Sequence, residues 1–202
     1  MKSPKYDWDS GGYDYLQSFE MISRNATVAG YIRVMGQKPY RILDAACGLA
    51  PVVEFLPGEA ISEHIAFDND SYVAQHIPYR FQAFKFYQSS FDQFFADERF
   101  AVESFDFVLY LGMYGGYDVY AERLERLLPY TKRNHHLILE AIEEHIEPVL
   151  EIMEQYHPDF IPIASCKIGI GDEGKTGLTR ERFRSIHLYK RAPDFNTSYG
   201  CS

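Results

Sequence analysis

The order of apolar segments along the chain constrains its fold more than any other feature. Five short apolar runs have the length of strands, and segments with helical spacing separate them. This alternation predicts a parallel sheet with helices on both faces. Two final strand-like runs have no helical segment between them, which predicts an antiparallel hairpin. The five runs lie at 40–46, 64–70, 84–88, 105–112 and 135–142, and the final pair at 159–171 and 182–192.

The chain has the length of one domain. A leading segment at 13–35 has a helical pattern that could cover the sheet, and no repeat, low-complexity tract or linker interrupts the sequence. The 202 residues suit a single domain with a substantial core. We therefore expect one α/β domain over 1–202, with an N-terminal helical lid at 1–36 and a core at 40–192.

Composition narrows the classes of function. The formal net charge of −9 argues against a nucleic-acid surface, which relies on clustered Lys and Arg. No apolar run approaches the roughly 20 residues of a membrane span, and the N-terminal residues lack a secretory apolar segment. Three cysteines cannot form a disulfide framework, and no Cys/His cluster indicates a metal site. We expect a cytoplasmic protein with no metal, no nucleic-acid partner and no membrane contact.

The stretch RILDAACGLAP, residues 41–51, has the pattern of a buried strand that runs into a tight turn. In open α/β sheets, ligands bind beyond such a turn. A dinucleotide fingerprint would need glycines near positions 46, 48 and 51, where this chain has Ala46, Gly48 and Pro51. Asp44, aimed into the turn, would repel a pyrophosphate and would suit a cationic ligand. These residues argue against NAD.

The second strand-like run ends in an acidic residue. Asp68 lies twenty positions beyond Gly48, which matches the spacing at which an acid reaches a ribose hydroxyl. Asp70 follows two residues later and remains an alternative. The loop and the acid together predict a site for a nucleoside-containing cation.

Three segments resemble, in order, the motifs of class I S-adenosylmethionine (SAM) dependent methyltransferases: ILDAACGLA, AFDND and FDFVLYLG. In that family the first motif is commonly L-D-x-G/A-C-G-x-G. Asp44, Ala46, Cys47 and Gly48 fit it, whereas Ala50 replaces the usual glycine. The motifs cover 40–118, and the strand order extends the resemblance to about residue 192. It implies a Rossmann-like methyltransferase fold with a mostly parallel seven-stranded sheet, an antiparallel C-terminal hairpin and helices on both faces.

The resemblance also implies SAM as the cofactor, with S-adenosylhomocysteine as its product. Asp68 would bind the adenosine ribose, and Ser89 or Ser90 would hydrogen-bond the adenine amine. Phe91 would stack on the adenine ring, although a core residue at the start of a helix is an equal reading. The implied cofactor-binding residues are Asp44, Ala46, Gly48, Asp68, Asn69, Ser89, Ser90, Phe91 and Tyr110.

Two residues are candidates for the catalytic step. His145 lies just beyond the carboxyl end of the fifth predicted strand, where a histidine can act as a general base. Tyr114 belongs to the segment after the fourth strand, which would line the methyl-transfer cavity. His135 and His136 begin the fifth strand in this reading, at the amino edge of the sheet and away from the cofactor. His64, within a strand, should be a structural residue with satisfied hydrogen bonds.

The segment GIGDEGKT, residues 169–176, satisfies the phosphate-loop pattern. That motif requires a helix directly after it, whose amino end holds the phosphate. The residues that follow are strand-like, and Asp172 and Glu173 would oppose a triphosphate. The segment is better explained as the tip of the final hairpin, and a nucleotide-binding protein is a remote alternative.

The acceptor class follows mainly from what the sequence lacks. Without a basic groove or an Asn/Asp-Pro-Pro-Tyr signature, the resemblance leaves a small molecule as acceptor, through a hydroxyl or an amine of a natural product, sugar or aromatic metabolite. The alternative is a catalytically silent SAM-binding or partner subunit. It is favoured by Ala50 and by the lack of an acid after the third strand. A homodimer is left open.

Overall fold

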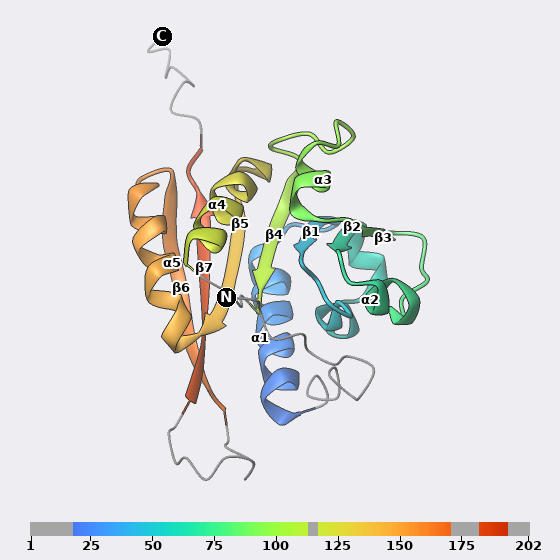
Figure 1. Cartoon of the computed structure of the whole chain (residues 1–202), viewed down its shortest axis with the longest axis horizontal. Helices are drawn as coiled ribbons and strands as arrows, with labels where there is room; N and C mark the ends of the chain where they lie inside the picture. Colours follow the sequence, from blue (N-terminus) through green and yellow to red (C-terminus); the bar gives the residue numbers. More distant parts are fainter. Residues whose placement is uncertain (1–17, 113–116, 171–181, 194–202) are drawn as a thin grey trace.

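The computed structural model describes residues 18–112, 117–170 and 182–193, and these form one seven-stranded sheet flanked by helices (Figure 1). The strand order is β3-β2-β1-β4-β5-β7-β6. The first five strands pair in parallel, and β7 pairs antiparallel with both β5 and β6. This confirms the predicted fold class. The strands are β1 (Tyr40–Ala45), β2 (Ile61–Asp68), β3 (Phe84–Gln88), β4 (Phe105–Leu111), β5 (Thr131–Ile142), β6 (Phe160–Ile170) and β7 (Arg182–Arg191).

The helices between the strands vary greatly in length. Among the helices that the structure describes, α1, α4 and α5 exceed ten residues and the others are shorter. The connection after β1 forms two 3₁₀ turns instead of an α-helix. The first turn ends at Phe55, because Pro57 disfavours a helical backbone at Leu56, which is extended. The elements are α1 (Phe19–Met35), η3 (Pro51–Phe55), η4 (Gly58–Ala60), α2 (Ser71–His76), α3 (Phe91–Phe95), α4 (Tyr117–Leu127), η5 (Leu128–Tyr130) and α5 (Glu143–Gln155).

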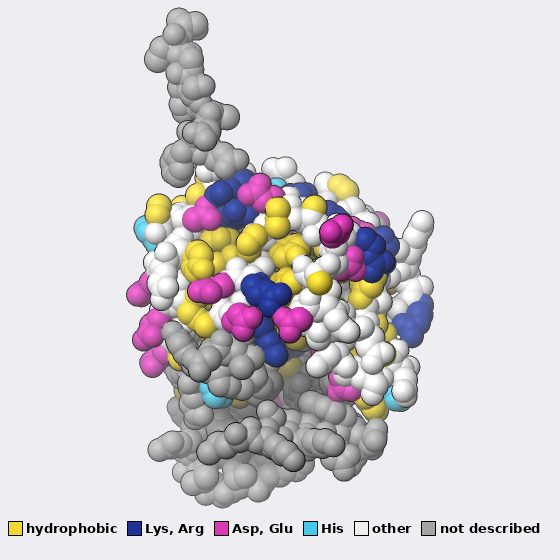
Figure 2. Space-filling model, turned by 45° about the horizontal axis from the view of Figure 1, so that its top comes forward, with side chains coloured by type: hydrophobic (Ala, Val, Ile, Leu, Met, Phe, Trp, Pro, Cys, Tyr) yellow, Lys and Arg dark blue, Asp and Glu magenta, His cyan; other side chains and the backbone are white. Residues whose placement is uncertain are grey.

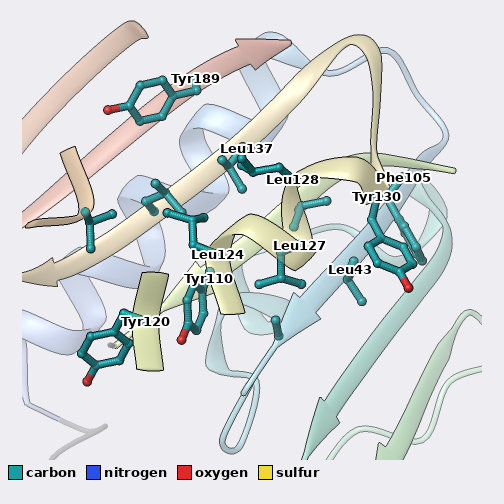
Figure 3. Close-up of a cluster of buried hydrophobic side chains, with 14 of the residues drawn as sticks. Leu43, Phe105, Tyr110, Tyr120, Leu124, Leu127, Leu128, Tyr130, Leu137 and Tyr189 are labelled. Carbon is teal, nitrogen blue, oxygen red and sulfur yellow. The ribbon is translucent and has the colours of Figure 1, made fainter. Parts of the chain in front are cut away.

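Helices cover both faces of the sheet. Side chains alternate between the two faces along each strand, so each strand contributes to both packing layers. Val28 and Ile32 of α1 pack on one face in a cluster that includes Ile42 of β1. The opposite face packs against α3, α4 and α5. Figure 3 shows side chains of α4, β4 and β5 meeting in that second cluster, among them Leu124 and Tyr110. The sheet is therefore buried on both sides, as the apolar runs predicted.

Several predicted elements have other bounds in the structure, and the second strand runs over Ile61–Asp68 and not over 64–70. The fifth strand begins at Thr131 and not at His135. Its first four residues are polar and carry no apolar signal, and the left-handed Asn134 (φ 65°) interrupts their regular pairing with β4. The short helix α3 begins at Phe91, which agrees with the reading of Phe91 as a core residue at the start of a helix. It begins with a capping box, in which the Ser90 hydroxyl accepts from the Gln93 amide and the Gln93 side chain accepts from the Ser90 amide.

The carboxyl ends of β1, β2, β4 and β5 lie at one edge of the sheet because these strands are parallel. In the row of residues nearest this edge, Ala45 of β1 is aligned with Phe67 of β2 and Tyr110 of β4. The loops that leave these strands therefore meet along the same edge. In open α/β sheets this is the edge where ligands bind.

Candidate functional site

The loop after β1 has a left-handed backbone at three alternate residues. The φ angles are 52° at Ala46, 52° at Gly48 and 49° at Ala50. This conformation costs a non-glycine residue roughly 1–2 kcal/mol. The Cys47 amide donates to the Phe67 carbonyl at 3.0 Å, which ties the loop to the end of β2. The loop backbone therefore has the left-handed conformation that favours glycine, although two of its three left-handed residues are alanines.

Asp68 holds this loop from the end of β2. The Gly48 amide donates to its Oδ2 and the Asp70 amide to its Oδ1, both at 2.9 Å. Burial raises the pKa of the Asp68 carboxyl, the two amide hydrogen bonds oppose that rise, and the nearby charges of Asp70 and Asp44 add to it. Each carboxylate oxygen has more than one acceptor position. Asp68 can therefore accept from ribose hydroxyls while it remains bonded to the loop.

Asp70 has a different role. Its carboxylate accepts from the Tyr72 amide at 2.8 Å and caps the N-terminus of α2. Asn69, between the two acids, is exposed to solvent. The geometry therefore favours Asp68 over Asp70 as the partner of a ribose, with Asn69 open to solvent beside it.

Asp44 is enclosed beneath the loop. Only 2% of it is exposed, and its Oδ2 lies 3.5 Å from Nε2 of His64 on the neighbouring strand. His64 is fully buried, as expected for a strand residue, but neither of its ring nitrogens has a hydrogen-bond partner. The prediction that its hydrogen bonds are satisfied is therefore wrong. Asp44 and His64 therefore form a buried polar contact between β1 and β2, which Arg41 and Glu63 also join by an ion pair at 2.6 Å.

The residues after β3 are engaged in local structure. The Ser89 amide donates to the Asp68 carbonyl at 2.9 Å, and its hydroxyl donates to the Ser90 carbonyl at 3.0 Å. Ser90 caps α3. Ser89 therefore lies directly beside the end of β2, whereas the hydroxyl oxygen of Ser90 is already used by the helix.

Phe91 packs in an aromatic cluster. Its ring lies edge-on to Phe67 at 5.1 Å and to Tyr110 at 5.6 Å between centroids, and the guanidinium of Arg123 sits 4.7 Å above its ring. These contacts cover much of the ring. They favour the core-residue reading of Phe91 over stacking on a bound base.

Tyr110, near the end of β4, points into the cluster beneath α4 (Figure 3). Burial raises the pKa of its hydroxyl to about 12, and the positive charge of Arg123 opposes this rise. Its side chain is only 2% exposed. Tyr110 therefore lies in the buried cluster next to the carboxyl edge of the sheet. Tyr114 lies outside the described residues.

A buried ionic cluster was missed by the sequence analysis. Glu140 of β5 has no exposed surface, and it pairs with Arg24 of α1 at 3.1 Å and Arg184 of β7 at 2.7 Å. Its Oε2 also accepts from the amide of Gly112, just beyond β4, at 2.9 Å. The available signal was a lone acid inside an apolar run. An acid in a buried strand requires partners, so its position indicates a buried ionic contact.

The predicted catalytic histidine lies at the expected edge. His145 is half-buried in the first turn of α5, directly after the carboxyl end of β5. His135 and His136 lie in the other half of that strand and line a cavity of about 330 Å³ together with Met35 at the end of α1. These positions separate His145 from the two histidines that were expected at the amino edge of the sheet.

Charge, metal-binding groups and membrane spans bear on other classes of function. On the face shown in Figure 2, Lys and Arg side chains lie beside acidic ones. Within 18–112, 117–170 and 182–193, no group of three or more His, Cys, Asp or Glu side chains could hold a metal ion. None of the described helices is long and apolar enough to cross a membrane.

The left-handed backbone at Ala46 predicts a measurable effect on the free energy of unfolding. Ala46 is exposed, so Ala46→Gly should relieve strain without loss of buried area and raise the free energy of unfolding by up to about 1 kcal/mol. Urea denaturation measures this. Ala96, which is also exposed, has φ −84°, so Ala96→Gly should lower stability by about 0.5–1 kcal/mol. Equal destabilisation by both changes would contradict the left-handed loop.

The chain matches known proteins by its fold and not by its sequence. No model of a known protein family matches the chain, and no curated protein matches it at a significant level. Solved structures do match. The N-methyltransferase NodS from Bradyrhizobium japonicum WM9, in complex with S-adenosylhomocysteine, superposes with a TM-score of 0.69 at 8% identity over 89% of this chain and 91% of NodS.

Two further structures agree. Magnesium protoporphyrin IX methyltransferase (ChlM) from Synechocystis PCC 6803, with bound SAM, has a TM-score of 0.66 at 14% identity over 92% of this chain and 91% of ChlM. The plantazolicin methyltransferase BpumL, in complex with S-adenosylhomocysteine, has a TM-score of 0.64 at 13% identity over 94% of this chain and 91% of BpumL. The chain therefore has the fold of SAM-dependent methyltransferases, as its sequence motifs predicted.

Proposed function

We propose that this chain binds SAM at the carboxyl edge of its sheet and transfers the methyl group to a small-molecule acceptor. The observation that carries the proposal is the hydrogen bond from the Gly48 amide to Asp68, which joins the loop after β1 to the acid at the end of β2. The similarity in fold to NodS, ChlM and BpumL, whose structures hold SAM or S-adenosylhomocysteine, supports the same cofactor.

The residues present fit such a cofactor. SAM supplies a methyl group on a positively charged sulfur, together with an ammonium group and an adenosine. Asp44 and Asp68 place two carboxylates at the loop, which favours a cation and disfavours the pyrophosphate of NAD. In this proposal Ala46 and Gly48 lie beneath the cofactor, Asp68 binds the ribose, and Ser89 and Asn69 flank the adenosine.

The chain's own contribution to methyl transfer is mainly positioning. The transfer breaks the sulfur–methyl bond as the acceptor's lone pair forms the new bond, so the acceptor atom must be held in line. His145, in the first turn of α5, is the proposed base for a hydroxyl or an acidic N–H of the acceptor. Tyr114, in the segment after β4, is proposed to line the space in which the acceptor is held.

A catalytically silent SAM-binding subunit is the second candidate. Ala50 carries a left-handed strain that glycine would not have, and no acid follows β3 to bind adenine. Turnover on an acceptor panel separates the two candidates, because both predict cofactor binding. Cytoplasmic location and a homodimer stay predictions, as does the small-molecule class of the acceptor.

Cofactor identity is tested by calorimetry with S-adenosylhomocysteine, run beside NAD and ATP. Only S-adenosylhomocysteine should bind, and Asp68→Ala should weaken it by about 1–3 kcal/mol, or about 5- to 150-fold in Kd. Asp92, an exposed acid on α3, is the control, and Asp92→Ala should leave the Kd unchanged. Loss of binding in Asp70→Ala with unchanged binding in Asp68→Ala would show that the ribose partner is wrong.

The role of His145 is tested once an acceptor panel gives turnover. His145→Ala should lower kcat at least 10-fold while the Kd for S-adenosylhomocysteine changes less than twofold, since general bases typically contribute 10²–10⁴-fold. His157, exposed beyond the other end of α5, provides the control variant His157→Ala, which should behave as the native protein. Equal losses in kcat and in cofactor affinity would remove His145 as the base.

A further inference from the structure

A cavity at the amino edge of the sheet has no role in the function proposed above. Its volume is about 330 Å³, and its lining comes from the end of α1 and the turn after it, the first half of β5, and single residues of β6 and β7. The described lining residues include a lysine, two histidines and two amide side chains, and none of them is an acid. The chain as a whole has a formal net charge of −9. The cavity therefore differs in charge from the rest of the chain, in a way that favours an anion.

His136 and Lys190 lie side by side in the lining of this cavity. They are directly paired residues of the antiparallel strands β5 and β7, so their side chains are on the same face of the sheet. His136 is also aligned with Phe107 of β4, and the two rings stack at 5.3 Å between centroids. Phe107 packs in the cluster beneath α1. The pair therefore lies on the face that α1 covers, where Met35 at the end of that helix also lines the cavity.

The ring of His136 has unused hydrogen-bonding capacity. Only 6% of the residue is exposed, and its Nδ1 is enclosed without a hydrogen-bond partner. Its Nε2 is not one of the enclosed unpaired atoms, and no described residue bonds to it. Because the ring lines the cavity, Nε2 is the nitrogen that a ligand there can reach. Buried polar groups are normally hydrogen-bonded, so this nitrogen indicates a ligand with a polar group.

Lys190 supplies the positive charge of the cavity. Burial, together with the nearby charges of Lys190 and His135, lowers the pKa of His136 to about 4, so its ring is neutral near pH 7. Asp106 approaches His135 at 3.5 Å, but it pairs with Lys132 at 2.7 Å. No acid among the described residues pairs with Lys190. In this part of the chain the cavity therefore offers an ammonium without a carboxylate partner, beside a neutral imidazole.

We propose that this cavity binds a small organic carboxylate, at a site separate from that of the cofactor. Lys190 pairs with the carboxylate, and Nε2 of His136 donates to it as a neutral N–H. Met35 and Ile163, which are 36% and 41% exposed, line the same cavity and contact the apolar part of the ligand. These apolar side chains favour an organic anion over inorganic phosphate. Because the cavity lies at the amino edge of the sheet, binding there requires no cofactor.

The test compares benzoate, benzamide and benzylamine, which have similar shapes and carry negative, neutral and positive charge. Kd values are measured by NMR titration of the full chain without cofactor. Benzoate should bind about 10-fold more tightly than benzamide, since only the carboxylate pairs with Lys190. Acetate, which lacks the ring, should bind more weakly than benzoate. The backbone amide shifts should change most at His136 and Lys190.

Variants of Lys190 test its role. Lys190→Gln should abolish the preference for benzoate, whereas Lys190→Arg keeps the charge and should retain part of the preference. Lys85 is an exposed lysine on β3, at the opposite side of the sheet from β6 and β7, so Lys85→Gln is the matched control and should bind benzoate as the native protein does. If Lys190→Gln does not fold, the native preference and the location of the shift changes decide the proposal.

Several results would overturn the proposal. One is equal binding of benzoate and benzamide by the native protein, or a benzoate preference that persists in Lys190→Gln. Tighter binding of benzylamine would show that the carbonyl end of α1 selects a cation instead. Tighter binding of inorganic phosphate than of benzoate, or equal binding of acetate, would exclude an organic carboxylate with an apolar part. Largest shift changes at Gly48 would place benzoate at the cofactor site, and largest changes at Leu150 would place it beside α5.

Discussion

The hydrogen bond between the Gly48 amide and Asp68 is the contact on which the candidate site depends. It joins the loop after β1 to the end of β2, and the parallel pairing of these strands brings the two together. The same carboxylate accepts from the Asp70 amide and so aligns the start of α2. One half-buried acid therefore holds the path of the loop and, in our proposal, contributes to the surface that a nucleoside would meet.

Three acids at this edge have different environments because of their neighbours. Asp44 faces His64 across two strands, whereas Asp68 accepts from backbone amides. Glu140 is fully buried between two arginines. A buried carboxylate requires compensation. Backbone amides supply it to Asp68 and guanidinium groups to Glu140, whereas Asp44 approaches the ring of His64 at 3.5 Å. In our account the first two acids serve the cofactor, and the third joins α1, β5 and β7.

The sequence predicted the sheet because each buried strand leaves a local apolar signal, and it singled out Asp68 because the motif spacing is local too. The capping box at Ser90 and Gln93 had a readable S-x-x-Q pattern. For the cluster of Glu140 with Arg24 the lone acid inside an apolar run was readable, but its partner was not, because the two residues lie 116 positions apart. The left-handed Ala46 and Ala50 could not be predicted either, because alanine ordinarily disfavours that conformation.

The measurement that tests the central claim most directly is the change in backbone amide NMR shifts when S-adenosylhomocysteine is added. Our account predicts that the largest changes centre on Gly48, Asp68 and Ser89, with smaller ones at Gly112. The cavity of about 530 Å³ beside α5, lined by residues such as Leu150 and Tyr189, should be unaffected. Largest changes at that cavity, or none at Gly48, would contradict the account.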